Sequence, residues 1–195
     1  MSDNEIQRKC IRISMLGDAG VGKTSILNVF LGIEFSTTIM SNIGIEKQNK
    51  KMKMKDGNEM KIIVWDTAGQ ERFHSIATST IQNSHGIALC FDVTKKQSFD
   101  NLPLWLKDIK EIKSDIPIIL FGNKADLIEK KVIQDDEAEE FARKNKLKYF
   151  ETSAKENINI DEGFKDIIED AYEKSGALLG MNLEEEKKNK KKKIC

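Results

Sequence analysis

The fold is decided by one stretch of the sequence, Gly17-Asp18-Ala19-Gly20-Val21-Gly22-Lys23-Thr24. The alternating apolar run before it, Cys10 to Leu16, predicts a strand, and the spacing after it predicts a helix from Lys23 to Leu31. In that context the pattern G-x-x-x-x-G-K-[ST] is typical of a loop that surrounds phosphate groups with backbone N–H groups and a helix N-terminus. Lys23 would supply charge to the terminal phosphates, and the Thr24 hydroxyl can ligate Mg²⁺. The motif alone does not choose between ATP and GTP.

The rest of the chain continues the alternation of strands and helices. Further strands are predicted at residues 45–54, 60–66, 87–92, 116–121 and 147–150, and further helices at 102–112, 135–145 and 160–172. Asp56-Gly57 predicts a hairpin turn between the first two of these strands. We therefore expect an α/β fold, a mostly parallel six-stranded sheet with one antiparallel edge strand and helices on both faces. Ligands of such sheets bind beyond the carboxyl ends of the strands.

Length and composition fit one domain that needs no crosslinks. The chain has 195 residues, and its three cysteines are too far apart for a disulfide framework or a zinc site, which favours a reducing compartment. No apolar run reaches the ~18 residues of a membrane-spanning helix. We expect a flexible N-terminus at 1–8, a folded domain at 9–176 and a disordered basic tail at 177–195.

The net charge of zero conceals an uneven distribution. The tail from Glu184 to Cys195 holds six lysines and three glutamates, so it carries +3 and the remaining chain carries −3. A mildly acidic body argues against a nucleic-acid partner.

A second motif indicates which base is bound. Asn123-Lys124-Ala125-Asp126 directly follows a predicted buried strand. The Asp126 carboxylate can accept hydrogen bonds from the N1–H and the exocyclic amine of guanine, whereas adenine would leave that carboxylate unpaired. The motif therefore favours GTP and argues against an ATP-dependent kinase built on the same phosphate loop.

From about Lys9 to Tyr172 the chain resembles the Ras-superfamily small GTPases, and most closely the Rab branch. The resemblance rests on the two motifs above, on Trp65-Asp66-Thr67-Ala68-Gly69-Gln70-Glu71-Arg72-Phe73, and on Glu151-Thr152-Ser153-Ala154-Lys155. It implies the small GTPase fold and a GTP/GDP switch that hydrolyses GTP slowly, depends on an activator, and regulates intracellular vesicle traffic. The alternative is a guanine-nucleotide-binding adaptor with weak switching or weak hydrolysis.

The resemblance also implies roles for individual residues. Gln70 would be catalytic by orienting the attacking water, and the Gly69 N–H would meet the γ-phosphate. Phe35 would lie against the base, and the alternative is an ordinary core phenylalanine. The implied Mg²⁺ ligands are Thr24, Asp66 (through water) and Asn42. The implied GTP/GDP contacts are Ala19, Gly20, Val21, Gly22, Lys23, Thr24, Ser25, Phe35, Asn42, Gly69, Asn123, Lys124, Asp126, Ser153, Ala154 and Lys155.

Two departures from the family pattern affect switching and partners. Asn42 stands where the family has a threonine that ligates Mg²⁺, and its side-chain oxygen lies one bond further from the backbone. We expect the first switch to close weakly on GTP, unless the loop shifts enough for asparagine to ligate well. Of three aromatic positions that Rab proteins use toward partners, only Trp65 is aromatic here, because the other two are Lys47 and Thr80. The neighbouring lysines 50, 51, 53 and 55 are interpreted as a charged strand edge.

The C-terminus indicates a membrane. Rab proteins end in cysteines that carry geranylgeranyl groups, and this chain ends in Cys195 behind a lysine run. One lipid plus a polybasic patch anchors stably, whereas the alternative is a solvated tail with a free thiol. The expected location is the cytosolic face of an intracellular membrane, with the protein otherwise cytoplasmic and monomeric. By resemblance, the expected partners are an exchange factor, a GTPase-activating protein, effectors and a prenyl-binding dissociation inhibitor.

Overall fold

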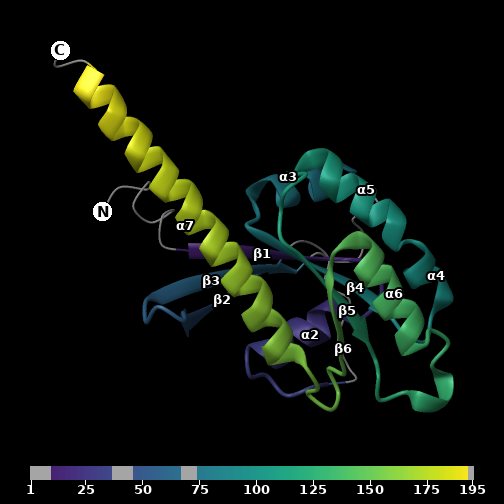
Figure 1. Cartoon of the computed structure of the whole chain (residues 1–195). Helices are drawn as coiled ribbons and strands as arrows, with labels where there is room; N and C mark the ends of the chain where they lie inside the picture. The colour runs from purple at the N-terminus through teal and green to yellow at the C-terminus, as the bar shows by residue number, and fades with distance from the viewer. Residues whose placement is uncertain (1–9, 37–45, 67–73, 193–195) are drawn as a thin grey trace.

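The computed structural model describes residues 10–36, 46–66 and 74–192 (Figure 1). Its centre is a six-stranded sheet in the order β2-β3-β1-β4-β5-β6. The β2–β3 pair is antiparallel, and the other four pairs are parallel. This confirms the predicted α/β sheet with one antiparallel edge strand. The strands are β1 (Cys10–Leu16), β2 (Glu46–Lys53), β3 (Glu59–Asp66), β4 (Gly86–Asp92), β5 (Ile118–Asn123) and β6 (Lys148–Glu151).

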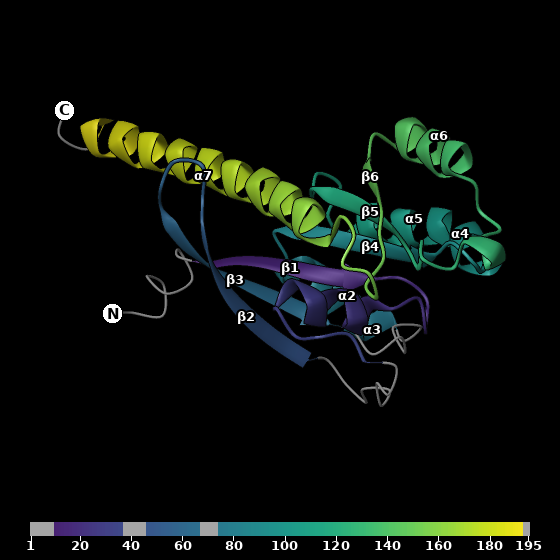
Figure 2. The ribbon, with the colours of Figure 1, turned by 90° about the horizontal axis from the view of Figure 1, so that it is seen from below.

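Helices cover both faces of the sheet, as Figure 2 shows from below. One core lies between the sheet and α2 and α7, and the second lies under α3, α4, α5 and α6. β4 serves both, since Ala88 and Cys90 belong to the first core and Leu89 and Phe91 to the second, as strand alternation requires. The helices are α2 (Lys23–Phe30), α3 (His74–Asn83), α4 (Lys96–Asp100), α5 (Leu102–Ile112), α6 (Asp135–Asn145) and α7 (Ile160–Lys192), with one 3₁₀ turn, η1 (Ile128–Lys130).

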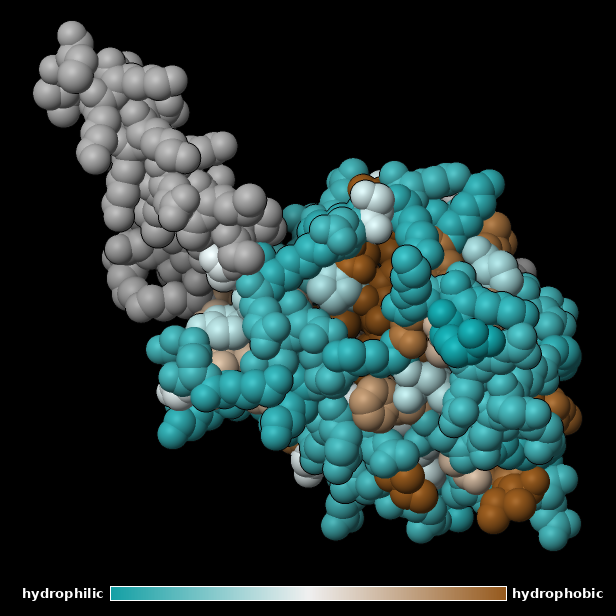
Figure 3. Space-filling view, in the orientation of Figure 1, coloured by the Kyte–Doolittle hydropathy of each residue, from teal (hydrophilic) through white to brown (hydrophobic). Residues whose placement is uncertain are grey.

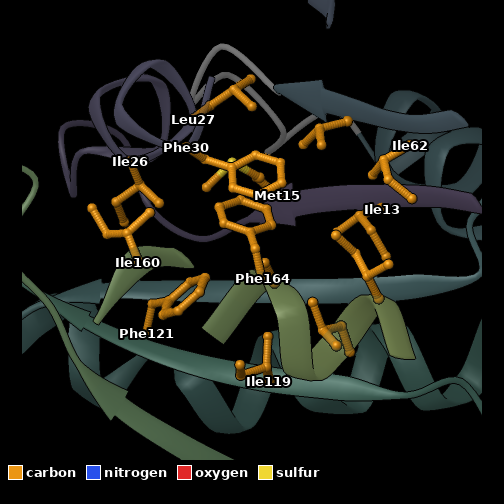
Figure 4. Close-up of a cluster of buried hydrophobic side chains, with 14 of the residues drawn as sticks. Ile13, Met15, Ile26, Leu27, Phe30, Ile62, Ile119, Phe121, Ile160 and Phe164 are labelled. Carbon is orange, nitrogen blue, oxygen red and sulfur yellow. The ribbon is translucent and has the colours of Figure 1, made fainter. Parts of the chain in front are cut away.

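The first core is built on aromatic contacts (Figure 4). The rings of Phe30 on α2 and Phe164 on α7 stack with centroids 4.0 Å apart, and Phe121 on β5 lies 5.7 Å from Phe164. Because α2 starts directly after the phosphate loop, this packing fixes the helix whose N-terminus faces the candidate site.

The sequence predicts neither α3 nor α4, and it places β5 two residues and β6 one residue too early. α3 reads His-Ser-Ile-Ala-Thr-Ser-Thr-Ile-Gln-Asn, and its serines and threonines are weak helix formers. α4 is five residues long, too short for a periodic signal. β5 starts at Ile118 instead of 116, because Pro117 has no N–H to donate to a strand ladder.

The last helix is longer than the sequence indicated. α7 was expected to end near Tyr172, with a disordered tail from 177, but the helix continues to Lys192 and projects beyond the body (Figure 1). The expected end was wrong because the segment lacks proline and is rich in glutamate and lysine, which have high helix propensity. Among the described residues, no helix is long and apolar enough to cross a bilayer.

Candidate nucleotide site

The phosphate loop joins β1 to α2 and is shaped by its glycines. Gly17 has φ 132°, and a Cβ atom there would lie 2.1 Å from the Cys90 carbonyl oxygen on β4, so no other residue fits. Lys23 is nearly buried, at 5% exposure, and its Nζ donates to the carbonyls of Gly17 (2.6 Å) and Asp18 (3.0 Å). The ammonium group therefore lies within the loop, where a point charge would meet phosphate oxygens.

The loop is anchored from outside through Asp18. The Asn101 side chain donates to Asp18 Oδ2 at 2.6 Å, and the Trp105 indole N–H donates to Asp18 Oδ1 at 3.0 Å. Both donors belong to the start of α5, more than 80 positions along the chain. Sequence reasoning includes Asp18 in the loop but does not find its partners Asn101 and Trp105, although an acidic side chain inside a phosphate-binding loop is a signal that it needs cationic or donor partners.

A hydroxyl and a carboxylate meet beside the loop. Thr24 Oγ1 at the start of α2 donates to Asp66 Oδ2 at the end of β3, at 2.5 Å. Asp66 is buried, at 2% exposure. Two hard oxygen donors from different elements fit the ligand chemistry of Mg²⁺. Thr24 and Asp66 therefore lie together, and their role as Mg²⁺ ligands stays a prediction, whereas Asn42 lies outside the described residues.

Asn123 links the phosphate loop to the two loops expected to bind guanine. Its Nδ2 donates to the Val21 carbonyl at 2.9 Å, and its Oδ1 accepts from the Ala154 N–H at 3.3 Å. A Cβ at Gly22 would lie 2.3 Å from Asn123 Nδ2, so glycine is required for this bridge. The buried Asn123 amide thus joins the end of β5 to the phosphate loop and to the loop after β6, at the carboxyl ends of the strands.

The expected guanine-reading carboxylate is held by a neighbouring loop. Ser153 Oγ donates to Asp126 Oδ1 at 2.7 Å and itself accepts from the Glu156 N–H at 3.0 Å. The loops are also joined through the backbone, where the Ala125 N–H donates to the Thr152 carbonyl at 3.0 Å. Asp126 and Ser153 are therefore adjacent, as their shared assignment to the base requires.

Lys124 spans from the guanine loop to the phosphate loop. Its backbone has φ 73°, which is strained for a residue other than glycine. Its Nζ donates to the Gly20 carbonyl at 2.9 Å and pairs with Asp92 Oδ2 at 2.6 Å. Asp92 is fully buried at the end of β4, and its Oδ1 also accepts from the N–H and the hydroxyl of Thr94. The contact of the Lys124 aliphatic stem with a base stays a prediction.

Burial also shifts the pKa of Glu151, whose carboxyl lies beside the loops expected to bind guanine. Burial, together with Asp135, raises the pKa of Glu151 at the end of β6. Lys131 donates to this carboxylate and to Asp135, which ties η1, α6 and β6 together behind the loops.

The remaining predicted residues lie at the surface or beyond the described part of the chain. Ala19 and Gly20 are exposed in the loop, Ser25 is half-buried on α2, and Lys155 is exposed and pairs with Glu156. Phe35 is 36% exposed, so the alternative that it is a core phenylalanine is wrong, and its contact with a base stays a prediction. Gly69, Gln70, Asn42 and Cys195 fall outside the described residues.

Comparison with known proteins agrees with this arrangement. The family model described as "Ras family" matches residues 12–173. The chain belongs to the Ras family. It is 42% identical to the Ras-related protein Rab-10 of Diplobatis ommata over 165 residues, which cover 84% of this chain and 82% of that protein. It is 39% identical to the Ras-related protein Rab-13 of Rattus norvegicus over 172 residues, 88% of this chain and 84% of that one.

These relatives make the chain a Rab-like small GTPase of membrane traffic. The three positions at which Rab proteins carry partner-facing aromatics differ in exposure here. Lys47 is exposed, Trp65 is half-buried directly opposite it in the β2–β3 register, and Thr80 on α3 is buried at 3% exposure. The surface around Trp65 therefore presents one aromatic side chain and a lysine, instead of three aromatic side chains.

Proposed function

We propose that this Rab-like GTPase binds GTP and GDP with Mg²⁺, hydrolyses GTP slowly in an activator-dependent way, and alternates between two states as a switch. The observation that carries the proposal is the Asn123 bridge. One buried amide holds Val21 of the phosphate loop and Ala154 of the expected guanine loop, so phosphate and base would be bound by one rigid frame.

Guanine selection is assigned to Asp126, supported by Ser153. Exchange of Asp126 to Asn replaces an acceptor pair with an amide, which can donate to the oxygen that xanthine carries in place of the guanine amine. We expect Asp126→Asn to weaken GDP binding by about 100-fold or more and to bind xanthosine diphosphate instead. Weakened GDP binding without a gain for the xanthine nucleotide would contradict the assignment.

Thr24 and Asp66 are the described residues that would hold Mg²⁺, with Asp66 acting through water. When bound, Mg²⁺ neutralises charge on the β- and γ-phosphates. Lys23 would share that task from within the loop. Gln70 is assigned the orientation of the attacking water, because phosphoryl transfer depends on positioning and charge stabilisation more than on a strong base.

The second candidate is an adaptor that binds guanine nucleotides and switches weakly, and Asn42 in place of threonine favours it. A single-turnover assay of GTP hydrolysis, with and without Mg²⁺, separates the two. The switch predicts Mg²⁺-dependent phosphate release that Gln70→Leu abolishes. The adaptor predicts bound GTP that persists with no difference between wild type and Gln70→Leu.

Membrane attachment is assigned to Cys195 and the lysine-rich end of the chain. We propose one geranylgeranyl group on Cys195 and location on the cytosolic face of an intracellular membrane. The lysines add about 1 kcal/mol each near an anionic leaflet, which complements a single lipid. Cys195→Ser should move the protein to the soluble fraction of a cell lysate, and unchanged membrane fractionation would refute lipidation there. Exchange factor, activator, effectors and a dissociation inhibitor are the proposed partners of a monomer.

A further inference from the structure

A row of lysines covers one face of the β2–β3 hairpin. Alternation along β2 exposes Lys47, Lys51 and Lys53, and Lys61 is exposed on β3. We call these four residues the basic strip. The register places Lys51 directly opposite Lys61, and Lys47 directly opposite Trp65. In Figure 3 the lobe that contains the hairpin is mostly hydrophilic.

Edge protection accounts for only part of the basic strip, because three of its lysines lie on β2 and the fourth lies on β3. Lysines on an edge strand prevent unwanted pairing, and β2 is an edge. But Lys61 belongs to β3, which is flanked by β2 and β1. Like charges directly opposite each other destabilise a sheet, so the Lys51–Lys61 pair works against the fold.

Among the residues that the structure describes, one ion pair compensates charge of the basic strip. The one acidic side chain on the same face of the two strands is Glu59, whose carboxylate pairs with Lys51 at 3.0 Å. The chain outside the segment 184–195 carries a net charge of −3, so this face concentrates positive charge on an otherwise acidic body. Lys50 does not contribute, because it turns to the other face, where its ammonium donates to the Phe30 carbonyl.

The hairpin is held rigidly, which gives the basic strip a fixed shape. At its far end the hairpin lies beside α7 (Figure 2). There the Lys55 N–H donates to Glu169 of α7 at 3.1 Å, and the Tyr172 hydroxyl donates to Asp56 at 2.7 Å. At its near end, half-buried Trp65 precedes Asp66 of the nucleotide site. The exposed lysines of the basic strip therefore extend over about 20 Å of β2, at ~3.3 Å per residue from Lys47 to Lys53.

We propose that the basic strip binds an extended, acidic protein segment. Alternate residues of a strand lie ~6.7 Å apart, so carboxylates at every second position of an extended segment match Lys51 and Lys53. The Trp65 ring offers an aromatic contact at one end, and aromatic side chains are common anchors of interfaces. This inference rests on the proposed function as a switch, because it specifies the chemistry of a protein partner that such a switch would bind.

The test uses full-length protein in which the six lysines of the tail are glutamine, so that the tail does not bind the probe. The probe is a fluorescein-labelled peptide of about eight residues, alternating glutamate and threonine, which at ~3.3 Å per residue is long enough to span the strip. Its affinity is measured by fluorescence anisotropy. The variant is Lys51→Gln with Lys61→Gln. The control is Lys107→Gln with Lys144→Gln, whose side chains are similarly exposed on helices at 67% and 65%.

We expect the strip variant to bind about fivefold more weakly and the control variant to match the parent. Equal losses in both variants, or no binding by the parent, would overturn the proposal. So would strip-dependent binding to phosphatidylserine vesicles with none to the peptide, because the partner would then be a membrane. Fluorescent GDP is titrated into the same samples. Peptide binding without GDP binding would refute the proposed switch and leave the basic strip intact.

Discussion

Exchange of Trp105 to Phe tests whether α5 positions the phosphate loop. The substitution keeps an aromatic ring against the second core and removes the indole N–H that donates to Asp18 Oδ1 at 3.0 Å, together with part of the ring system. A hydrogen bond to a charged group contributes about 1.5–3 kcal/mol, and the partial exposure of Asp18 favours the lower end. About 1.5 kcal/mol corresponds to a change of about tenfold in an equilibrium constant.

Release of a fluorescent GDP analogue should therefore accelerate by up to about tenfold in Trp105→Phe. Loss of the second donor, in Asn101→Ala, should have an effect of similar size, since its bond to Asp18 is 2.6 Å long. The assay is stopped-flow fluorescence with excess unlabelled GDP, and thermal unfolding of the same samples shows whether the domain stays folded.

A double-mutant cycle separates positioning from packing. In an Asp18→Ala background the indole N–H has no acceptor in the loop, so Trp105→Phe should no longer change the release rate. If Trp105→Phe accelerated release equally in both backgrounds, the effect would come from repacking of α5, and the reasoning would be refuted.

Three further changes probe the site and the fold. Gly22→Ala should weaken GDP binding by about 100-fold, because its Cβ would displace Asn123. The control is Gly57→Ala, which also lies at positive φ but in open space and should leave GDP binding unchanged. Equal losses of GDP affinity in a titration of both variants would contradict the role of the Asn123 bridge. Asn42→Thr should raise the affinity for GTP relative to GDP and change its Mg²⁺ dependence, and identical affinities would exclude a weak first switch. Burial and two neighbouring cations lower the pKa of His85 to about 4, so the native state keeps it neutral while the unfolded chain takes up a proton near 6.5. Its contribution, about 1–2 kcal/mol after discounting for partial exposure, should be present above pH 6.5 and lost as the pH falls toward 4, and urea unfolding of His85→Asn should lack this component.

The parts of the site that could be predicted from sequence are those whose chemistry is local. The loop from Gly17 to Thr24 can be recognised from sequence because its spaced glycines and the lysine that would contact phosphate lie within one short segment. The same holds for Asn123 to Asp126 after a buried strand. Strand alternation likewise gave β1 with both ends correct, since its apolar pattern stops where the glycines begin.

The parts that could not be predicted depend on contacts between distant segments. Nothing near Asp18 indicates that Asn101 and Trp105 will donate to it, because the pairing exists only once α5 packs beside the loop. The role of Asp92 as the partner of Lys124 is of the same kind. Lys51 lies opposite Lys61 because of the register of the hairpin. The turn residues predict a hairpin but do not determine which residues of its two strands are paired.

Two separate elements, β5 and α5, hold the phosphate loop in position. The conformation of the loop therefore depends on contacts with distant parts of the domain as well as on its own sequence. On one side, Asn123 and Lys124 hold the carbonyls of Val21 and Gly20 from the end of β5. On the other, α5 holds the loop through the side chain of Asp18. The β5 anchor continues directly into the loops assigned to the base, whereas the α5 anchor reaches only the phosphate end. The first anchor therefore ties the phosphate loop to the loops assigned to the base, while the second ties it to α5.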